Sequence, residues 1–385
     1  MSRFRITALC ALALAVASAI AVPASAGSAA VRVSPRGFGT PSQIPWGSVG
    51  SGWVLTDWAT GRPSPHHSVA SYLVLTNQAG QRYLVLKESG TLAHADLLDW
   101  SGNGRSALFY AETNAGRTTL LVVSLRTGAI EHSFVVPTSS TIDFQSASFT
   151  RPNGLAVVVS TYTTHAVLKR YSLSGQSLVT YPSALASVGK LDGSWLYRHD
   201  GTVLAIGAAH GLAIVANDGA PTGRLYFANS SYCQPKSWWS ATVVLATCAV
   251  GVHSESRLFE FSIAGGAPRA LTRVNVPPDY GDISGWRVGG HVYVDVASAC
   301  GYVYLARLVG AAPIMVHVPG VPTGYSILVV GASNSSLALT ASIACHGGPS
   351  LLWYTPSSNS TRVVLGPPVT GGVIGVSLPY PTRLG

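Results

Sequence analysis

Residues 97–112 read Leu-Leu-Asp-Trp-Ser-Gly-Asn-Gly-Arg-Ser-Ala-Leu-Phe-Tyr-Ala-Glu. The first four and the last six residues of this stretch are mostly apolar, and the turn between them, 102–104, is Gly-Asn-Gly. Gly and Asn both tolerate positive φ, so such a turn between two apolar runs predicts a β-hairpin. Similar pairs of runs surround the turns at 200–201 and 289–290, which indicates that the hairpin recurs along the chain.

A second hairpin pattern, an extended run followed by a turn and another extended run, occurs seven times, with glycine in six of the turns and Ser358 in the last. Successive turns are 48, 47, 44, 46, 45 and 48 residues apart, and a near-constant step of this size is typical of repeated supersecondary units. With the first hairpin added, each unit has four strands, which predicts an all-β, seven-bladed β-propeller. A parallel β-helix has much shorter repeats, and helical periodicity is nearly absent. The seven turns lie at Gly80, Gly128, Gly175, Gly219, Gly265, Gly310 and Ser358.

The first unit lacks a strand at its amino-terminal side. Residues 53–58 already have the pattern of its second strand, and residues 373–378 form an extended run near the end of the chain. We therefore expect the two ends of the chain to pair in one blade and to close the ring.

The composition is that of a β-rich protein with a large core. Of the 385 residues, 47% are apolar and 10% are charged, against roughly 25% charged in an average globular protein. This excludes a disordered chain. The net charge of +9 comes from scattered residues, and no basic run is interleaved with aromatic residues, so specific nucleic-acid binding is not expected.

The amino-terminal residues have the pattern of a secretory signal peptide. Arg3 and Arg5 precede an apolar run over 6–22, and Ala26 ends a small-x-small cleavage site. We expect a signal peptide over 1–26, a lead-in over 27–46, a single propeller domain over 47–380 and a tail over 381–385. The mature protein is expected to be an exported, secreted or wall-associated monomer without a membrane-spanning segment.

Four cysteines remain after removal of residues 1–26. An even number in an exported chain favours two disulfides. Three pairings are possible, and the predicted blades favour Cys233 with Cys248 and Cys300 with Cys345. No metal site and no cofactor are expected, because the cysteines show no metal-ligand spacing.

The segment 99–105 resembles the blade motif of TolB-like propellers. Further stretches resemble a group of exported actinobacterial propeller proteins of unassigned function, and this resemblance extends from about residue 90 to the end. This resemblance implies a propeller fold and export, and it assigns no catalytic residue to this sequence. The stretches are 149–155, Trp238-Trp239 leading to Cys248, 299–301 and 350–354.

Motifs for known catalytic sites are absent from the sequence: it contains no GxSxG, HExxH, P-loop or GxGxxG. Asp279 and Asp282 are the closest pair of acidic residues and are weak candidates for a catalytic carboxylate pair, although turn formation explains them as well. Asp295 is expected to be a hydrogen-bonded strand residue.

Four aromatic residues, Tyr232, Trp238, Tyr280 and Tyr325, precede or begin predicted blades and are candidates for a binding face on loops. We therefore expect an exported, non-enzymatic binding or scaffold propeller that recognises a protein, peptide or glycan of the cell envelope. The alternative is a secreted polysaccharide hydrolase or lyase that uses the carboxylate pair.

Overall fold

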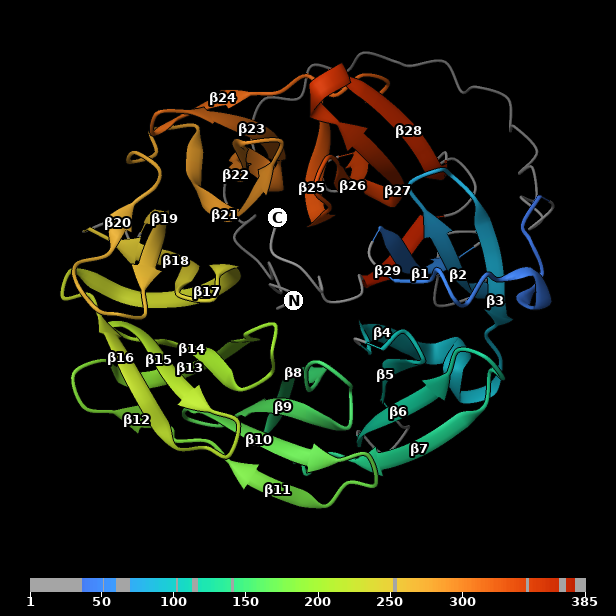
Figure 1. Cartoon of the computed structure of the whole chain (residues 1–385), viewed down its shortest axis with the longest axis horizontal. Coiled ribbons are helices and arrows are strands. Elements are labelled where there is room, and N and C mark those ends of the chain that lie inside the picture. Colours follow the sequence, from blue (N-terminus) through green and yellow to red (C-terminus); the bar gives the residue numbers. More distant parts are fainter. Residues whose placement is uncertain are drawn as a thin grey trace, which may run out of the picture.

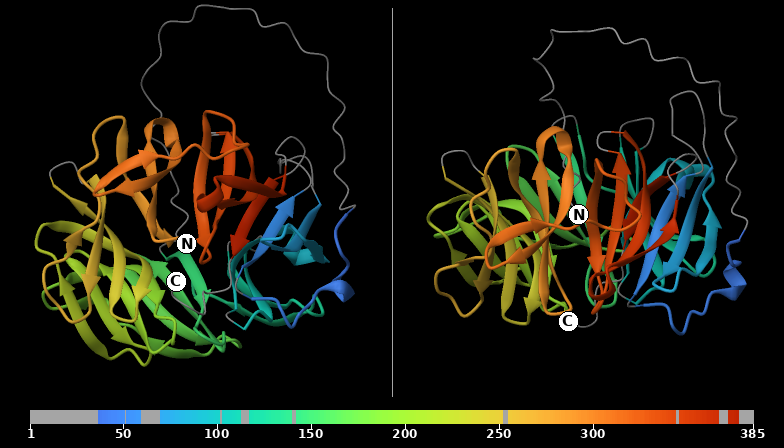
Figure 2. Two further views of the ribbon diagram at one scale, coloured as in Figure 1. Left: turned by 45° about the horizontal axis from the view of Figure 1, so that its top comes forward. Right: turned by 90° about the horizontal axis from the view of Figure 1, so that it is seen from above.

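The computed structural model describes residues 37–377, except 51, 60–69, 102, 113–116, 140–141, 252–254, 344–345 and 367–371. The described residues form β-strands, short 3-10 helices and turns. The sheets are arranged in a ring around a central axis (Figure 1), and their strands stand side by side around that axis when the ring is viewed from its edge (Figure 2). The protein is therefore an all-β propeller. No helix in the described ranges has the length and apolar character needed to cross a membrane.

Four sheets contain four antiparallel strands each, and one strand of each sheet lies nearest the axis (Figure 1). From the inner strand outward, the first is β29 (Gly372–Ser377), β1 (Trp53–Ala59), β2 (Ser71–Asn77), β3 (Arg82–Lys87); the second is β4 (Ala95–Trp100), β5 (Ser106–Glu112), β6 (Thr118–Ser124), β7 (Ile130–Val135); the third is β8 (Asp143–Phe149), β9 (Ala156–Tyr162), β10 (Ala166–Ser172), β11 (Ser177–Thr180); the fourth is β25 (Tyr325–Ala332), β26 (Leu337–Ile343), β27 (His346–Thr355), β28 (Ser360–Leu365).

The strands between the third and fourth of these sheets form one sheet of 13 strands. Its members are β12 (Ala184–Leu185), β13 (Gly189–Tyr197), β14 (Val203–Ala208), β15 (Gly211–Ala216), β16 (Pro221–Tyr226), β17 (Ser230–Ser240), β18 (Val243–Val250), β19 (Glu255–Ser262), β20 (Arg269–Ala270), β21 (Asp279–Val288), β22 (His291–Ser298), β23 (Val303–Val309) and β24 (Ala312–Met315).

The prediction of seven separate four-stranded sheets was wrong. The described strands form four such sheets and one sheet of 13 strands. Two contacts join strands of neighbouring repeats into the large sheet. Ala208 of β14 pairs with Cys233 of β17, and Ser256 of β19 pairs with Gly281 of β21. β17 and β21 are longer than the other inner strands, and they reach the preceding hairpins.

The first sheet combines distant parts of the chain. β29 lies antiparallel to β1, with Leu55 opposite Ser377 and Ala59 opposite Gly372. The strand expected over 373–378 is thus present beside the strand expected over 53–58.

The outer hairpins turn where the sequence predicted. All six predicted turn glycines have positive φ, from 62° at Gly310 to 95° at Gly219. In the last repeat Ser358 ends a 3-10 helix, and the left-handed residue is Asn359 with φ 44°. Asn tolerates this conformation better than other side chains, so the turn forms without glycine.

The hydrophobic core lies within and between neighbouring sheets. One cluster joins Leu108 and Val122 of the second sheet to Phe149, Val157 and Val159 of the third, all at most 1% exposed. Burial of each such side chain contributes about 1.5–3 kcal/mol, so the ring is stabilised mainly by apolar packing between blades.

A buried ion pair also joins these two sheets. Arg151, just after β8, donates from its guanidinium to both carboxylate oxygens of Asp99 on β4, at 3.0 and 3.1 Å. The backbone N–H groups of Trp100 and Phe149 donate to the same carboxylate, each at 2.8 Å.

Asp295 on β22 is a buried carboxyl whose described hydrogen bonds come from uncharged donors. Ser284 Oγ donates to it at 2.6 Å and the Val329 N–H donates at 3.2 Å, which links β21, β22 and β25. Burial raises the pKa of Asp295 to about 7.

This pKa predicts that the protein loses stability as the pH rises. A carboxyl whose folded pKa is raised stabilises the fold fully below its unfolded pKa and loses that contribution as the pH passes through about 7. We expect the free energy of unfolding in urea to fall between pH 5 and pH 8, and Asp295→Asn to flatten the fall, since one pKa unit corresponds to about 1.4 kcal/mol. Equal slopes for Asp295→Asn, the exposed control Asp218→Asn and wild type would contradict this.

Candidate functional site

The two carboxylates singled out in the sequence both belong to β21, and both are near Tyr304. The Tyr304 hydroxyl donates to Asp279 Oδ2 at 2.8 Å, and both carboxylates contribute to a raised pKa of Tyr304, after burial. Asp282 is 1% exposed and accepts a hydrogen bond from Thr272 Oγ1. Burial raises the pKa of Asp282 to about 6. The bond between Thr272 and Asp282 connects the segment before β21 to β21 itself. Because Asp282 is buried, a polysaccharide cannot reach its carboxylate.

The four aromatic candidates do not form one exposed face. All four lie on strands: Tyr232 and Trp238 on β17, Tyr280 on β21 and Tyr325 on β25. Trp238 is buried in the core and donates to the Leu196 carbonyl at 3.2 Å. Tyr280 is 61% exposed, whereas Tyr232 and Tyr325 are half-buried.

One predicted disulfide is present. Cys233 and Cys248 are opposite each other on β17 and β18 and are bonded. The second predicted bridge, Cys300 to Cys345, and the cleavage site at Ala26 involve positions outside the described residues.

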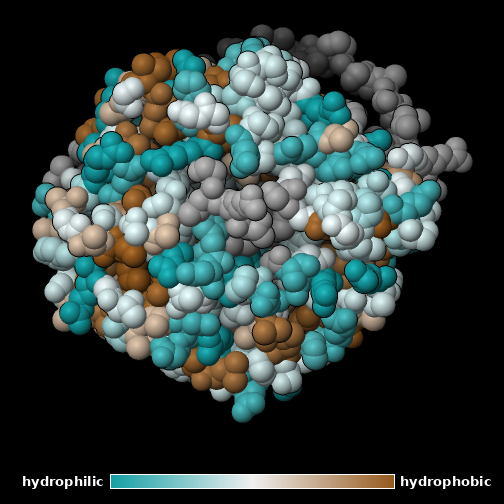
Figure 3. Space-filling model, in the orientation of Figure 1, coloured by the Kyte–Doolittle hydropathy of each residue, from teal (hydrophilic) through white to brown (hydrophobic). Residues whose placement is uncertain are grey.

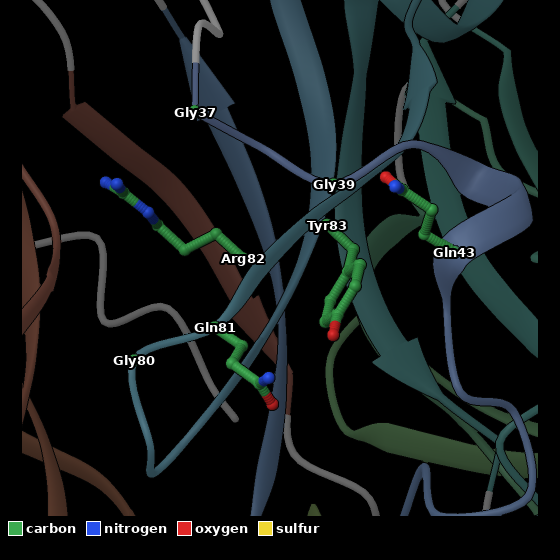
Figure 4. A pocket seen from close by; sticks show the side chains of 7 residues that line it. All are labelled: Gly37, Gly39, Gln43, Gly80, Gln81, Arg82 and Tyr83. Atoms are coloured by element: carbon green, nitrogen blue, oxygen red, sulfur yellow. The ribbon is translucent and has the colours of Figure 1, made fainter.

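A cavity of about 390 Å³ lies at the outer edge of the first sheet (Figure 4). Its lining comes from β3, the turn before it and the lead-in segment, with Gly39 beside Tyr83. Among the described residues that line it, Arg82 is the only charged one, and it is placed over the Phe38 ring. These described lining residues include no acid–base pair and no nucleophile activated by a base.

A hydroxyl and a carboxylate meet on β13, where the strand is interrupted by a wide bulge. Leu191 pairs with Ala208 and Trp195 pairs with Ile206, so the three residues 192–194 are opposite the single residue Gly207. Bulges of this kind redirect side chains and are frequent beside active sites. We call this segment the β13 bulge.

Two glycines allow the β13 bulge to form. Gly193 has φ +80°, and a Cβ there would lie 2.5 Å from Ser160 Oγ of the preceding sheet. A Cβ on Gly207 would lie 2.3 Å from Asp192 Oδ1 and from Ser194 Oγ. The glycines therefore let the carboxylate and the hydroxyl approach the backbone of β14.

The bulge brings a hydroxyl against a carboxylate. Ser194 Oγ donates to Asp192 Oδ1 at 2.6 Å, and the Ser194 N–H donates to the same oxygen at 2.9 Å. Asp192 Oδ2 is buried, with no hydrogen bond among the described residues that meets normal geometry. Burial raises the pKa of Asp192, and Ser194, the nearby Gln234 amide and the charge of Lys236 offset part of that rise.

The next repeat along the chain supplies two polar side chains to this site. Gln234 and Lys236 lie on β17 and are half-buried, and Lys236 Nζ donates to Gln234 Oε1 at 3.3 Å. Burial lowers the pKa of Lys236, and Asp192 partly counteracts this. Opposite pKa shifts of neighbouring groups are typical of acid–base sites.

The chain contains the same local turn in a different environment. In the turn after β13, Thr202 donates from its hydroxyl to Asp200 Oδ1 at 2.8 Å and from its N–H at 3.0 Å. This turn is exposed, and hydrogen bonds from Arg198 lower the pKa of Asp200 to about 2. The local Asp-Gly-hydroxyl turn is thus shared, but only the buried copy has a carboxylate of raised basicity.

None of the predicted site residues is Asp192, Ser194, Gln234 or Lys236, because these four belong to no recognisable motif in the sequence. Gly193 inside an otherwise extended run was the available signal, because an isolated glycine in a strand often marks a bulge. The approach of Lys236 from the next repeat depends on the folded ring and has no signal in the local sequence.

Within the described ranges no group of three or more His, Cys, Asp or Glu side chains is placed to hold a metal ion. On the face shown in Figure 3, exposed apolar side chains form separate patches between hydrophilic ones, so that face offers no continuous apolar surface.

Comparison with known proteins identifies the fold. No family model and no curated protein matches the sequence. The propeller domain of the Trilobed protease from Pyrococcus furiosus has a TM-score of 0.55 at 11% identity over 82% of this chain and 95% of that one. Prolyl oligopeptidase B from Galerina marginata gives 0.54 at 10% identity over 84% of this chain, and oligopeptidase B from Leishmania major gives 0.50 at 9% identity over 84%. This chain spans 52% and 49% of the lengths of those two peptidases.

These comparisons overturn the expectation of a non-enzymatic binding or scaffold protein. That expectation took a propeller without catalytic motifs as a sign of binding, whereas similar propellers occur in peptidases. The polysaccharide alternative is dropped as well, because Asp282 is enclosed and Asp279 is bonded to Tyr304.

Proposed function

We propose that this protein is a hydrolase that acts on peptides, with Ser194 as nucleophile and Asp192 as general base. The observation that carries the proposal is the Ser194 hydroxyl at 2.6 Å from the Asp192 carboxylate in the β13 bulge. A nucleophile within hydrogen-bond reach of a base that other groups orient is the general arrangement for covalent catalysis. The names of the similar peptidase structures support a peptide as the substrate.

The proposed reaction has two steps. Ser194 Oγ attacks the peptide carbonyl carbon while Asp192 takes the hydroxyl proton, and that proton passes to the leaving amine as the C–N bond breaks. Water, deprotonated by Asp192, then hydrolyses the acyl-enzyme and restores Ser194. Burial makes Asp192 a stronger base than an exposed aspartate, and the positive charge of Lys236 favours its ionised form.

We also propose that the ring has seven blades. The 13-stranded sheet is interpreted as three blades that are joined by the contacts at Cys233 and Gly281. The four separate four-stranded sheets are the other four blades. Pairing of β1 with β29 supports a ring closed by the two ends of the chain.

We also propose that the protein is exported and belongs to the actinobacterial TolB-like group that its blade motif resembles. The signal-like residues 1–26 and the Cys233–Cys248 disulfide support export.

A serine-directed fluorophosphonate tests the nucleophile. We expect it to label wild-type protein at Ser194, as read by peptide mass spectrometry, and to leave Ser194→Ala unlabelled. Thr202→Ala removes the hydroxyl of the exposed Asp-Gly-hydroxyl turn and should be labelled like wild type.

Cleavage of a panel of fluorogenic peptides tests the activity itself. Wild type and Thr202→Ala should cleave these peptides at similar rates. Ser194→Ala should cleave them at least about 1,000-fold more slowly, because it lacks the nucleophile. Labelling elsewhere, or equal cleavage by Ser194→Ala, would refute the proposal.

A further inference from the structure

Two acidic side chains are buried in the first sheet, which lies beside the second sheet in the ring (Figure 1). Asp57 of β1 is 1% exposed, and Glu88, the residue after β3, is 4% exposed. Buried aspartates and glutamates are almost always paired with another group, because an ionised carboxylate loses its hydration when it is buried. The partner of each of these two carboxyls therefore decides their protonation state.

The strand register places both side chains on the same face of the first sheet. Asp57 is opposite Leu73 on β2, and Leu73 is opposite Leu86 on β3. The Glu88 N–H donates to the Ser71 carbonyl at 2.9 Å, so the pairing continues to Glu88. Side chains on one face recur every second residue, and Glu88 therefore shares the face of Leu86, Leu73 and Asp57. Leu73 belongs to the apolar cluster that this sheet shares with the second sheet, so this face is turned toward the second sheet.

The Glu88 and Asp57 side chains are hydrogen-bonded to each other. A hydrogen bond between two carboxyl groups requires a proton on one of them, because ionised carboxylates only accept. Glu88 Oε1 is buried and accepts no hydrogen bond from a donor in the described part of the chain. Burial raises the pKa of Glu88 to about 9, and the charge and hydrogen bond of Asp57 and the charge of Asp96 contribute. The pair therefore holds one proton at neutral pH.

The titratable groups on the surrounding elements do not take the place of this proton. Lys87 at the end of β3 and His94, which ends the 3-10 helix before β4, are both exposed. Asp96 on β4 adds a further negative charge, and it also raises the pKa of Tyr110, its partner on β5. β29 has no titratable side chain. The charges that act on Glu88 are thus those of other carboxylates.

We propose that Asp57 and Glu88 form a proton-dependent contact that holds the first sheet against the second sheet at neutral pH and releases it at alkaline pH. This inference is independent of the proposed function and of Ser194. The proton stabilises the closed arrangement fully below the ordinary pKa of a glutamate, and this contribution declines as the pH rises toward 9. Opening of the first sheet should therefore increase with pH and become constant above about 9.

Limited proteolysis with subtilisin, followed by mass spectrometry, measures this opening. In wild type, cleavage within residues 53–100 should accelerate by up to about 10-fold per pH unit between pH 6 and pH 9, after division by the cleavage rate of an unstructured reference peptide. In Glu88→Gln the amide donates to Asp57 without a titrating proton, so the corrected rate should stay nearly constant. Glu131→Gln, at an exposed position on β7, is the matched control and should follow wild type.

Asp57→Asn places the permanent donor on the other partner and should give the same flat profile, which keeps the test valid if Glu88→Gln fails to fold. Infrared spectroscopy at pH 8 gives the second readout. The band of a buried protonated carboxyl should be present in wild type and in Asp295→Asn, and it should be lost in Glu88→Gln and in Asp57→Asn. Parallel proteolysis profiles for wild type and both variants, or a carboxyl band that neither variant removes, would overturn the inference.

Discussion

Asp99→Ala is expected to lower the free energy of unfolding by about 3–5 kcal/mol, the range for removal of one partner from a buried ion pair. The substitution leaves Arg151 buried without the carboxylate that it contacts at 3.0 Å. The N–H groups of Trp100 and Phe149 lose the same acceptor. Because these donors come from two neighbouring sheets, the loss weakens the contact between blades.

Urea unfolding followed by tryptophan fluorescence measures this effect. Asp99→Asn keeps a carbonyl acceptor and should be less destabilising than alanine. Asp218→Ala removes an exposed aspartate that accepts only the Ala220 N–H among the described contacts, and it should change stability by less than about 1 kcal/mol. A similar small change for Asp99→Ala would show that the ion pair contributes little.

Asp192→Asn is expected to reduce kcat by about 1,000- to 10,000-fold, because the amide cannot accept the Ser194 proton. Asn keeps the size of the side chain and an oxygen for the Ser194 N–H, so the bulge should persist. The matched control is Asp200→Asn, which changes the same Asp-Gly-hydroxyl turn where it is exposed, and it should cleave peptide at the wild-type rate.

The pH profile separates a base from a purely structural aspartate. Cleavage by wild type should rise with pH as Asp192 ionises, and the midpoint should lie above the ordinary range of an aspartate, since burial raises this pKa. The acidic limb should disappear in the residual activity of Asp192→Asn. Wild-type activity in Asp192→Asn, or an equal loss in Asp200→Asn, would reject the assigned role.

Local signals in the sequence account for the hairpins. The glycines at the predicted turns adopt positive φ. Glycine tolerates this conformation because it has no Cβ, so the turns could be located from the sequence. Joining of sheets was not predictable, because the pairs Ala208–Cys233 and Ser256–Gly281 depend on how far β17 and β21 extend toward neighbouring repeats.

The candidate site was less predictable than the fold for the same reason. Lys236 follows Asp192 and Ser194 by about 40 residues, and the two segments meet only in the folded ring. The acidic pair that was predicted, Asp279 and Asp282, was chosen for closeness in sequence. In the folded chain these carboxylates serve as acceptors for Tyr304 and Thr272.

The pairing of β1 with β29 has a consequence for synthesis in the cell. Residues 53–59 leave the ribosome early, but their partner over 372–377 is made more than 300 residues later. During that interval one edge of β1 has no native neighbour, and an open strand edge is a template for association with other chains. Chains that terminate before β29 would keep that edge exposed, so premature termination should yield aggregation-prone products that chaperones and proteases must remove.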